Sequence, residues 1–417
     1  MSQGDTLATA DSVLKQHYAS GPLLNMAAQS NTAYGILTKK NKRSTSSGGG
    51  RSWTQPIRIA YPGGGSSDFA TAMAATNNAS GYGVFTVTRK SHYRLAKMQT
   101  ELLEATETGA EDAFEDMIDE LDRGIEAEAN YLNFRLFRNS GGAAGQMTNS
   151  AFNTTVCTLK DPADAWAYVK GDSVNLASTD GTSGSLRSGS LTVASVQRSA
   201  GTITFTANIS TGVATAAQND FLFLAGDFGA AGSGFSDWVP DAAPSATLFY
   251  GQDRSIEPEM LGGLRVDNST SGGPTHELLI DMMAKADQFG ANLDVIIMHP
   301  LATADLTKQL EGKWVIMKSQ DYDGSEAEIG YKGWNVSLNG KDVTIVTDRV
   351  CPQKKVYGLQ LDTWTLFSAG TAPMFLQKRT GSILKVSENA DAIEARIGEY
   401  WNLSNKGPGW NVVGILP

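Results

Sequence analysis

The chain has 417 residues, a formal net charge of −10 and only two cysteines. This length is more than one hydrophobic core commonly supports, so we expect two or more subdomains. The acidic balance disfavours a protein that coats nucleic acid, because neutralising phosphates needs clustered Lys and Arg, and the sequence has no apolar run of about 18 residues that could cross a membrane.

Residues 1–50 are polar and end in NKRSTSSGGG, a composition typical of a flexible arm. The basic cluster TKKNKR (38–43) is expected to be a solvated part of this arm, and contact with nucleic acid is the alternative. The first residues contain no basic segment followed by an apolar one, so no secretory signal is expected. Because Cys157 and Cys351 are far apart and form no CxxC pair, we expect reduced thiols, as in a cytoplasm.

Two strand patterns follow the arm, at 53–61 (WTQPIRIAY) and 82–90 (YGVFTVTRK). In the first pattern Ile57, Ile59 and Tyr61 alternate with other residues, as on a half-buried strand. The Gly-rich connection of about 20 residues between the two patterns is too long for a compact domain. We therefore predict a projecting hairpin that lies on another surface.

The longest helical pattern spans residues 111–142. Apolar residues recur there at spacings of three and four, which places them on one stripe of a helix of roughly 30 residues, about 45 Å long. Thr108 and Glu111 have capping-box spacing, and Gly141 and Gly142 predict the end of the helix. Acidic residues fill the first half, so we expect a solvated acidic face opposite the stripe. The stripe consists of Phe114, Ile118, Leu121, Ile125, Ala129, Leu132 and Leu136.

Residues 152–228 contain short alternating strands and no long helical pattern, with RSAG (198–201) as a hairpin turn. This pattern predicts a small antiparallel barrel or sandwich inserted into a different fold. From residue 275 the pattern is mixed. The expected elements are an amphipathic helix at 275–290, a buried strand at 293–300, a short helix at 301–312, a hairpin on Asn339-Gly340 at 334–346, a strand at 354–367 and two C-terminal strands around NKGPG.

The sequence contains no phosphate-binding loop, and its four histidines, His17, His92, His276 and His299, show no metal-ligand spacing. His299 ends a buried strand and is the best single candidate for chemistry. No nucleophile motif accompanies it, so a structural role is favoured. The segment DYDGSE (321–326) is only faintly similar to a calcium loop, because it lacks the ligand register. We therefore expect no catalytic residues, no cofactor, no metal site and no enzyme.

The order of these parts resembles the major capsid protein of tailed bacteriophages, the Hong Kong 97-type fold. The segment GYKGWNVSLNGKDVTIVTDRVCPQKKVYGLQLDTWTLF also looks like the end of that family's axial domain. The resemblance implies an α+β fold with an inserted all-β barrel or sandwich, in which the long helix is the spine of a flat subunit. The implied divisions are an N-terminal arm (1–50), an E-loop hairpin (51–96), a peripheral domain with the spine helix (97–151), an inserted β domain (152–228), a peripheral return segment (229–274), an axial domain (275–372) and C-terminal peripheral strands (373–417).

In function, the resemblance implies a coat protein whose copies form the pentamers and hexamers of an icosahedral head shell. The shell would enclose phage double-stranded DNA without sequence-specific binding and without contact with a membrane. Such a protein would be made in the cytoplasm of the bacterial host and would end up in the virion. Subunit contacts of the hairpin, within the pair of strands or with a neighbour, are expected from Trp53, Ile57, Ile59, Phe85 and Val87.

Two departures from the family pattern refine this expectation. No lysine lies between Lys42 and Lys90, so the hairpin offers no amine for the isopeptide cross-link of some members, and we expect non-covalent subunit contacts. The segment of about 50 residues before the hairpin is too short for the scaffolding segment that some members carry. A separate scaffolding protein is therefore expected, and a portal protein and a decoration or cement protein are further candidate partners.

Two other functions are open at this point. A phage or bacterial surface or carbohydrate-binding structural protein would use the β insert, and exposed aromatic side chains among Phe152, Trp166 and Tyr168 would favour it. A hydrolase would need a Ser, Cys or Asp partner beside His299.

Overall fold

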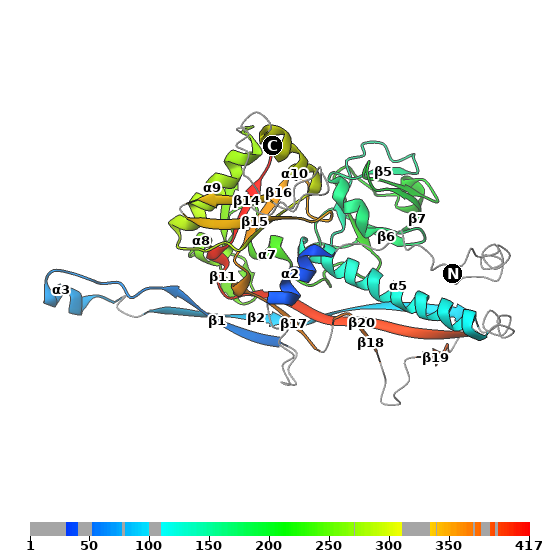
Figure 1. The fold of residues 1–417 in the computed structure, drawn as a ribbon, viewed down its shortest axis with the longest axis horizontal. Coiled ribbons are helices and arrows are strands. Elements are labelled where there is room, and N and C mark those ends of the chain that lie inside the picture. Colours follow the sequence, from blue (N-terminus) through cyan, green and yellow to red (C-terminus); the bar gives the residue numbers. More distant parts are fainter. Residues whose placement is uncertain are drawn as a thin grey trace, which may run out of the picture.

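The computed structural model describes residues 31–40, 52–76, 80–99, 110–270, 272–310, 334–338, 340–369, 372–376, 384–387 and 391–417. Figure 1 shows a long, thin base with two lobes standing on one of its faces, and a hairpin that extends the base far beyond the lobes. Within the described residues, no helix combines the length and the apolar character needed to cross a bilayer.

The base is a sheet organised around one long strand, β20 (Ala392–Asn405), which pairs antiparallel with every other strand of that sheet. Its longest partner is β3 (Lys90–Gln99), a strand that the sequence analysis did not predict. Gly124 of the long helix packs closely on this sheet, because a Cβ atom there would lie 2.5 Å from Cδ1 of Ile397. The remaining strands are β17 (Trp364–Ser368), β18 (Met374–Phe375) and β19 (Leu384–Val386).

The long helix is α5 (Ala110–Leu136), with 27 residues and a length of about 40 Å. It ends at Leu136, so the predicted end at Gly141 and Gly142 is wrong. At this end the hydrogen bonds span three residues, as in a 3₁₀ turn. The N–H groups of Phe137 and Arg138 donate to the carbonyls three residues back, at 3.2 and 3.1 Å. The predicted capping residue Thr108 lies outside the described residues.

The C-terminal part of α5 departs from the predicted one-sided stripe. Residues 131–137 are all buried, including the polar Asn133 and Arg135. The short helix α2 (Thr32–Lys40) covers this part of α5, and its Tyr34 N–H donates to Asn133 Oδ1 at 2.9 Å. A helix enclosed on all sides has no one-sided apolar stripe, so that expectation is wrong for this part of the helix. The acidic face was predicted for the first half of α5, where most side chains lie outside what the structure describes.

The first lobe, called the α/β lobe, has a mixed six-stranded sheet in the order β12-β21-β16-β13-β15-β14. Its central strand β13 (Val295–Met298) is buried at every residue, as predicted. The predicted hairpin is confirmed as β14 (Trp334–Leu338) and β15 (Lys341–Thr347), with Gly340 at a φ of +76°. The other elements are α8 (Pro258–Gly262), β12 (Leu264–Asp267), α9 (Thr275–Gln288), α10 (Pro300–Leu310), β16 (Lys355–Leu359), η4 (Leu361–Thr363), η5 (Pro408–Trp410) and β21 (Val412–Ile415).

The second lobe, called the β lobe, has a six-stranded antiparallel sheet in the order β4-β9-β6-β7-β8-β5. The predicted turn at 198–201 is confirmed between β7 and β8. A bridge between Met147 and Leu159 brings the two edges of the sheet together. The elements are β4 (Gly145–Gln146), β5 (Val156–Thr158), η2 (Pro162–Ala167), β6 (Ser173–Ala177), β7 (Leu191–Gln197), β8 (Thr202–Phe205), α6 (Ile209–Gly212) and β9 (Phe221–Leu224).

One hydrophobic core connects these parts. It runs from Phe85 in the hairpin through Leu132 and Phe137 at the end of α5 to Leu176 in the β lobe and Tyr357 in the α/β lobe. The two lobes and the base therefore pack on one another through this core, and the α/β lobe has a second core of its own around Leu278, Met282 and Ile296. Short elements between the lobes complete it, and these are α7 (Phe235–Trp238), β10 (Leu248–Phe249) and β11 (Gln252–Asp253).

Candidate assembly surfaces

The hairpin arm, defined here as residues 52–88, consists of β1 (Ser52–Ala60), α3 (Phe69–Ala74) and β2 (Gly81–Thr88). Its strands pair antiparallel, as the alternating sequence pattern predicts. Only the root of the arm lies against the body: Phe85 meets the ring of Trp238 edge-on, with 5.0 Å between centroids. In Figure 1 the arm then continues away from both lobes, with α3 at its far end.

The five residues predicted for hairpin contacts lie at this root. Ile57, Phe85 and Val87 are buried within the chain itself. Trp53 is half-buried and stacks on Phe367 with 4.8 Å between ring centroids. Ile59 is half-buried and lines a groove of about 380 Å³ at the junction with the α/β lobe. The observed contacts of all five are therefore within the subunit, and contact of these residues with a neighbour stays a prediction.

The far part of the arm carries apolar side chains that the chain itself leaves uncovered. Phe69 is 79% exposed and Met73 is 72% exposed, and α3 has no buried residue. The helix is held locally by Asp68, which accepts the Thr71 N–H at 2.9 Å. A six-residue helix with exposed Phe and Met gains little stability alone, and apolar groups gathered in this way mark an interaction site. This surface was not predicted, although the i, i+4 spacing of Phe69 and Met73 in FATAM indicates two apolar side chains on one helix face.

A second uncovered surface lies on the base. Along β3 the side chains alternate, so His92 and Arg94 face α5 while Tyr93 and Leu95 face away from it. Tyr93 and Leu95 are 57% and 54% exposed. This outer face is the side of the base opposite the lobes in Figure 1. It offers a second region where another chain could bury apolar area.

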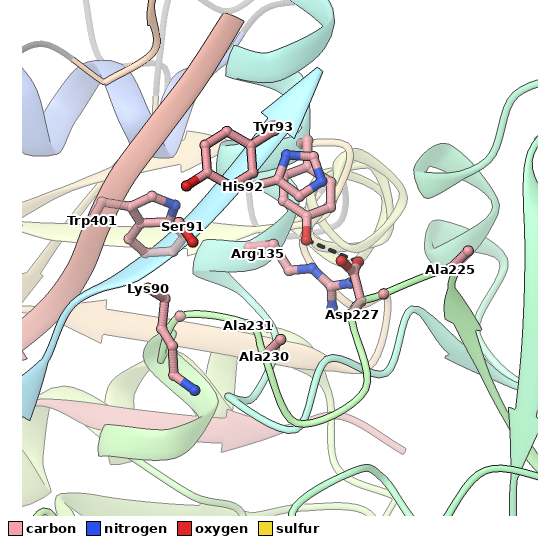
Figure 2. Close-up of a pocket in the computed structure, with 13 residues that line it drawn as sticks. Lys90, Ser91, His92, Tyr93, Arg135, Ala225, Asp227, Ala230, Ala231 and Trp401 are labelled. Carbon is pink, nitrogen blue, oxygen red and sulfur yellow. Dashed lines mark hydrogen bonds and ion pairs between the residues drawn. The ribbon is translucent and has the colours of Figure 1, made fainter. Parts of the chain in front are cut away.

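The end of α5 is joined to the β lobe by a buried ion pair. Arg135 is fully buried and its Nη2 contacts Asp227 Oδ2 at 2.5 Å, while its Nη1 donates to the Ala143 carbonyl at 2.9 Å. The Tyr131 hydroxyl donates to the same carboxylate at 2.9 Å. Figure 2 shows Arg135 beside Asp227, and both residues line a hollow of about 200 Å³. This ion pair holds the end of α5 in place against the β lobe, because separating it would leave a buried charge without its counter-charge.

A cleft of about 660 Å³ lies between the β lobe and the α/β lobe, and many of the residues that line it are charged. Arg138 Nε donates to Asp164 Oδ1 at 2.8 Å on one wall, and burial raises the pKa of Asp164 to about 6 while Arg138 opposes the rise. Asp237 accepts the Ser140 N–H at 2.6 Å. Although residue Asp237 keeps some exposure, its carboxylate is enclosed by protein, and this burial raises its pKa to about 7.

The described residues that the sequence singled out for possible chemistry are buried in the protein interior. His299 is buried, and its Nδ1 accepts the N–H of Leu301 at 3.2 Å at the start of α10. Burial lowers the pKa of His299, so the neutral ring that accepts this hydrogen bond is favoured. Cys157 and Cys351 are both buried and free, as expected. The faint calcium-like segment 321–326 lies outside the described residues.

The feature that would favour a carbohydrate-binding insert is not found. Throughout residues 152–228, all of which the structure describes, no aromatic side chain is exposed. Tyr168 is fully buried, and Phe152 and Trp166 are half-buried. The guanidinium groups of Arg198 and Arg349 lie 5.2 and 4.8 Å from the ring centroid of Trp166. This ring therefore packs against the protein's own cations.

Comparison with known proteins gives a likeness in structure only. No family model matches the chain, and no curated protein matches it. A chain of the capsid asymmetric unit of cyanophage A-1(L) superposes with a TM-score of 0.56 and 11% identity, covering 97% of each chain. The two chains therefore share a fold, and the α+β architecture of this chain is similar to that of the cyanophage capsid chain. Weaker likenesses include Mycobacterium phage Ogopogo (TM-score 0.46, 10% identity, 99% and 100% covered) and the SrpI encapsulin complex of Synechococcus elongatus PCC 7942 (0.44, 10%, 100% and 96%).

Proposed function

We propose that this chain is the major capsid protein of a tailed phage, and that its copies assemble into the icosahedral head shell around double-stranded DNA. The observation that carries the proposal is the shared fold with the cyanophage capsid chain over 97% of both chains. The shape agrees with it: a thin base and a long arm suit a subunit that tiles a wall, and both carry uncovered apolar side chains.

The arm supplies the mechanism of assembly. Ordering a long hairpin in water costs conformational entropy that its few internal contacts do not offset. Overlap with a neighbouring subunit would bury Phe69 and Met73, each worth about 1.5–3 kcal/mol when fully covered. Because the chain has no lysine from position 43 to position 89, this contact would be non-covalent.

The finer division into Hong Kong 97-type parts is also a proposal. The arm corresponds to the E-loop, α5 to the spine helix, and the α/β lobe to the axial domain. The β lobe corresponds to the inserted domain, and the meeting of its edges at Met147 and Leu159 supports a closed barrel. The sheet around β20 corresponds to the peripheral domain, since β3 and β20 form the long flat part of the base.

The proposed partners follow from this function. Copies of the same chain would form pentamers and hexamers, and a separate scaffolding protein would guide their closure. A portal protein and a decoration or cement protein are further partners, with the enclosed DNA contacted without sequence preference. The place of the assembled protein would be the virion, after synthesis in the host cytoplasm.

Electron microscopy of the purified full-length protein tests the function directly. We expect uniform shells, or pentamers and hexamers, either from the protein alone or after co-expression with the gene beside it in the genome. A stable monomer or small oligomer under every condition would overturn the proposal. The matched comparison is a variant in which the arm residues 62–80 are replaced by a short turn. This change removes α3 and keeps the root of the arm.

A further inference from the structure

Three side chains with metal-binding groups converge where α5 crosses the base. They come from three elements: His92 from β3, Glu128 from α5 and Glu399 from β20. One ligand atom of each lies within 4.8 Å of the other two. His92 Nδ1 lies 2.5 Å from Glu128 Oε1, and both glutamates are fully buried. The spacing of these residues in the sequence gives no sign of this cluster.

The negative charge of the cluster is only partly balanced. Glu128 is satisfied by His92 and by Arg94, whose Nε lies 3.2 Å from Oε2. Glu399 Oε1 accepts the Trp401 Nε1–H at 2.7 Å. Its Oε2 is buried with no hydrogen-bond partner among the described residues. A buried carboxylate oxygen without a partner is costly, so it requires either a proton or a cation.

We propose that His92, Glu128 and Glu399 bind a divalent transition-metal ion, with Zn²⁺ as the best fit. One imidazole nitrogen and two carboxylate oxygens form a donor set that suits zinc. A doubly charged ion would give the Glu399 Oε2 a partner and would enter between His92 and Glu128 in place of their direct contact.

The surroundings of His92 support such a role. Its ring stacks on Tyr131 with 3.8 Å between centroids and an interplanar angle of 15°, which fixes its orientation. His92 also lines the hollow of about 200 Å³ drawn in Figure 2 and its side chain is 23% exposed, so the imidazole is the ligand of the three that solvent reaches. Groups that orient a ligating histidine strengthen metal binding.

The bound ion would fasten α5 to both long strands of the base. Its three ligands lie on β3, α5 and β20, so the ion would join the helix to the sheet. The three ligand side chains are polar and make no hydrophobic contact with one another, so the ion would supply the attraction between them.

Titration calorimetry with ZnCl₂ tests the site on the full-length protein after removal of metals with EDTA. We expect one ion per wild-type chain and a rise in Tm of about 2–5 °C at saturating zinc. Glu399→Gln can still accept the Trp401 hydrogen bond and should fold, but it should lose both the binding and the rise in Tm. Glu394→Gln is the matched control, since Glu394 lies on the same strand and pairs with Arg396 at 2.8 Å outside the cluster.

Either of two results would overturn the site. One is a folded wild-type protein that binds no zinc, which would mean that Glu399 holds a proton instead. The other is a Glu399→Gln variant that binds zinc as the wild type does. The measurement uses the unassembled subunit, so its failure would leave the proposed shell function untouched.

Discussion

The far part of the hairpin arm gives the sharpest prediction. Replacing Phe69 and Met73 together by Ser should weaken assembly without destabilising the subunit, because α3 has no buried residue. The two side chains are 79% and 72% exposed, so a neighbour can cover about three-quarters of each. At about 1.5–3 kcal/mol for a fully buried side chain, the pair is worth about 2–4 kcal/mol per contact. Since about 1.4 kcal/mol is a factor of ten, the critical concentration for assembly should rise about 30-fold to 1,000-fold.

Light scattering and size-exclusion chromatography over a dilution series would measure that critical concentration, and the thermal melt of the unassembled subunit would report its stability. The control is Val169→Ser, which removes an apolar side chain that is 48% exposed on the β lobe. We expect the control to assemble like the wild type. If the Phe69 and Met73 double variant assembles within about threefold of the wild-type critical concentration, the reasoning is refuted, because the expected rise is at least about ten times larger than that.

Three further predictions concern the subunit itself. Arg135→Met removes the only cation that the structure pairs with the buried Asp227 carboxylate among the described residues, and it should cost about 3–5 kcal/mol in a denaturant melt; an unchanged midpoint would mean that the pair is dispensable. Phe85→Ala should cost about 3–5 kcal/mol and free the arm, seen as faster proteolysis within residues 52–88. Asp237 has a folded-state pKa of about 7, above its ordinary value, so wild-type stability should fall as the pH rises from about 4 to about 7. Asp237→Asn should therefore be more stable than the wild type at pH 8, and this gain should vanish near pH 4.

Much of the local structure follows from patterns within a few residues. The alternation at 53–61 and 82–90, the turn at 198–201 and the hairpin through Gly340 all have their predicted form. Each is decided by side-chain period and by turn residues, which act over short distances. The strand β3 was not predicted because its sequence, KSHYRLAKMQ, is mostly polar and only Tyr93 and Leu95 give it an apolar alternation.

The sequence by itself determined the order and type of most elements, and with them the likeness to a capsid subunit. Only the tertiary structure decided which side chains are covered. Residues 131–137 are buried all round because α2 and the lobes enclose them, and Arg135 is tolerated there because Asp227, 92 positions away, neutralises it. Phe69 and Met73 have the apolar character of core residues, yet they stay exposed because the arm extends beyond the body. Burial depends on what the rest of the chain places beside a residue, and no local pattern contains that information.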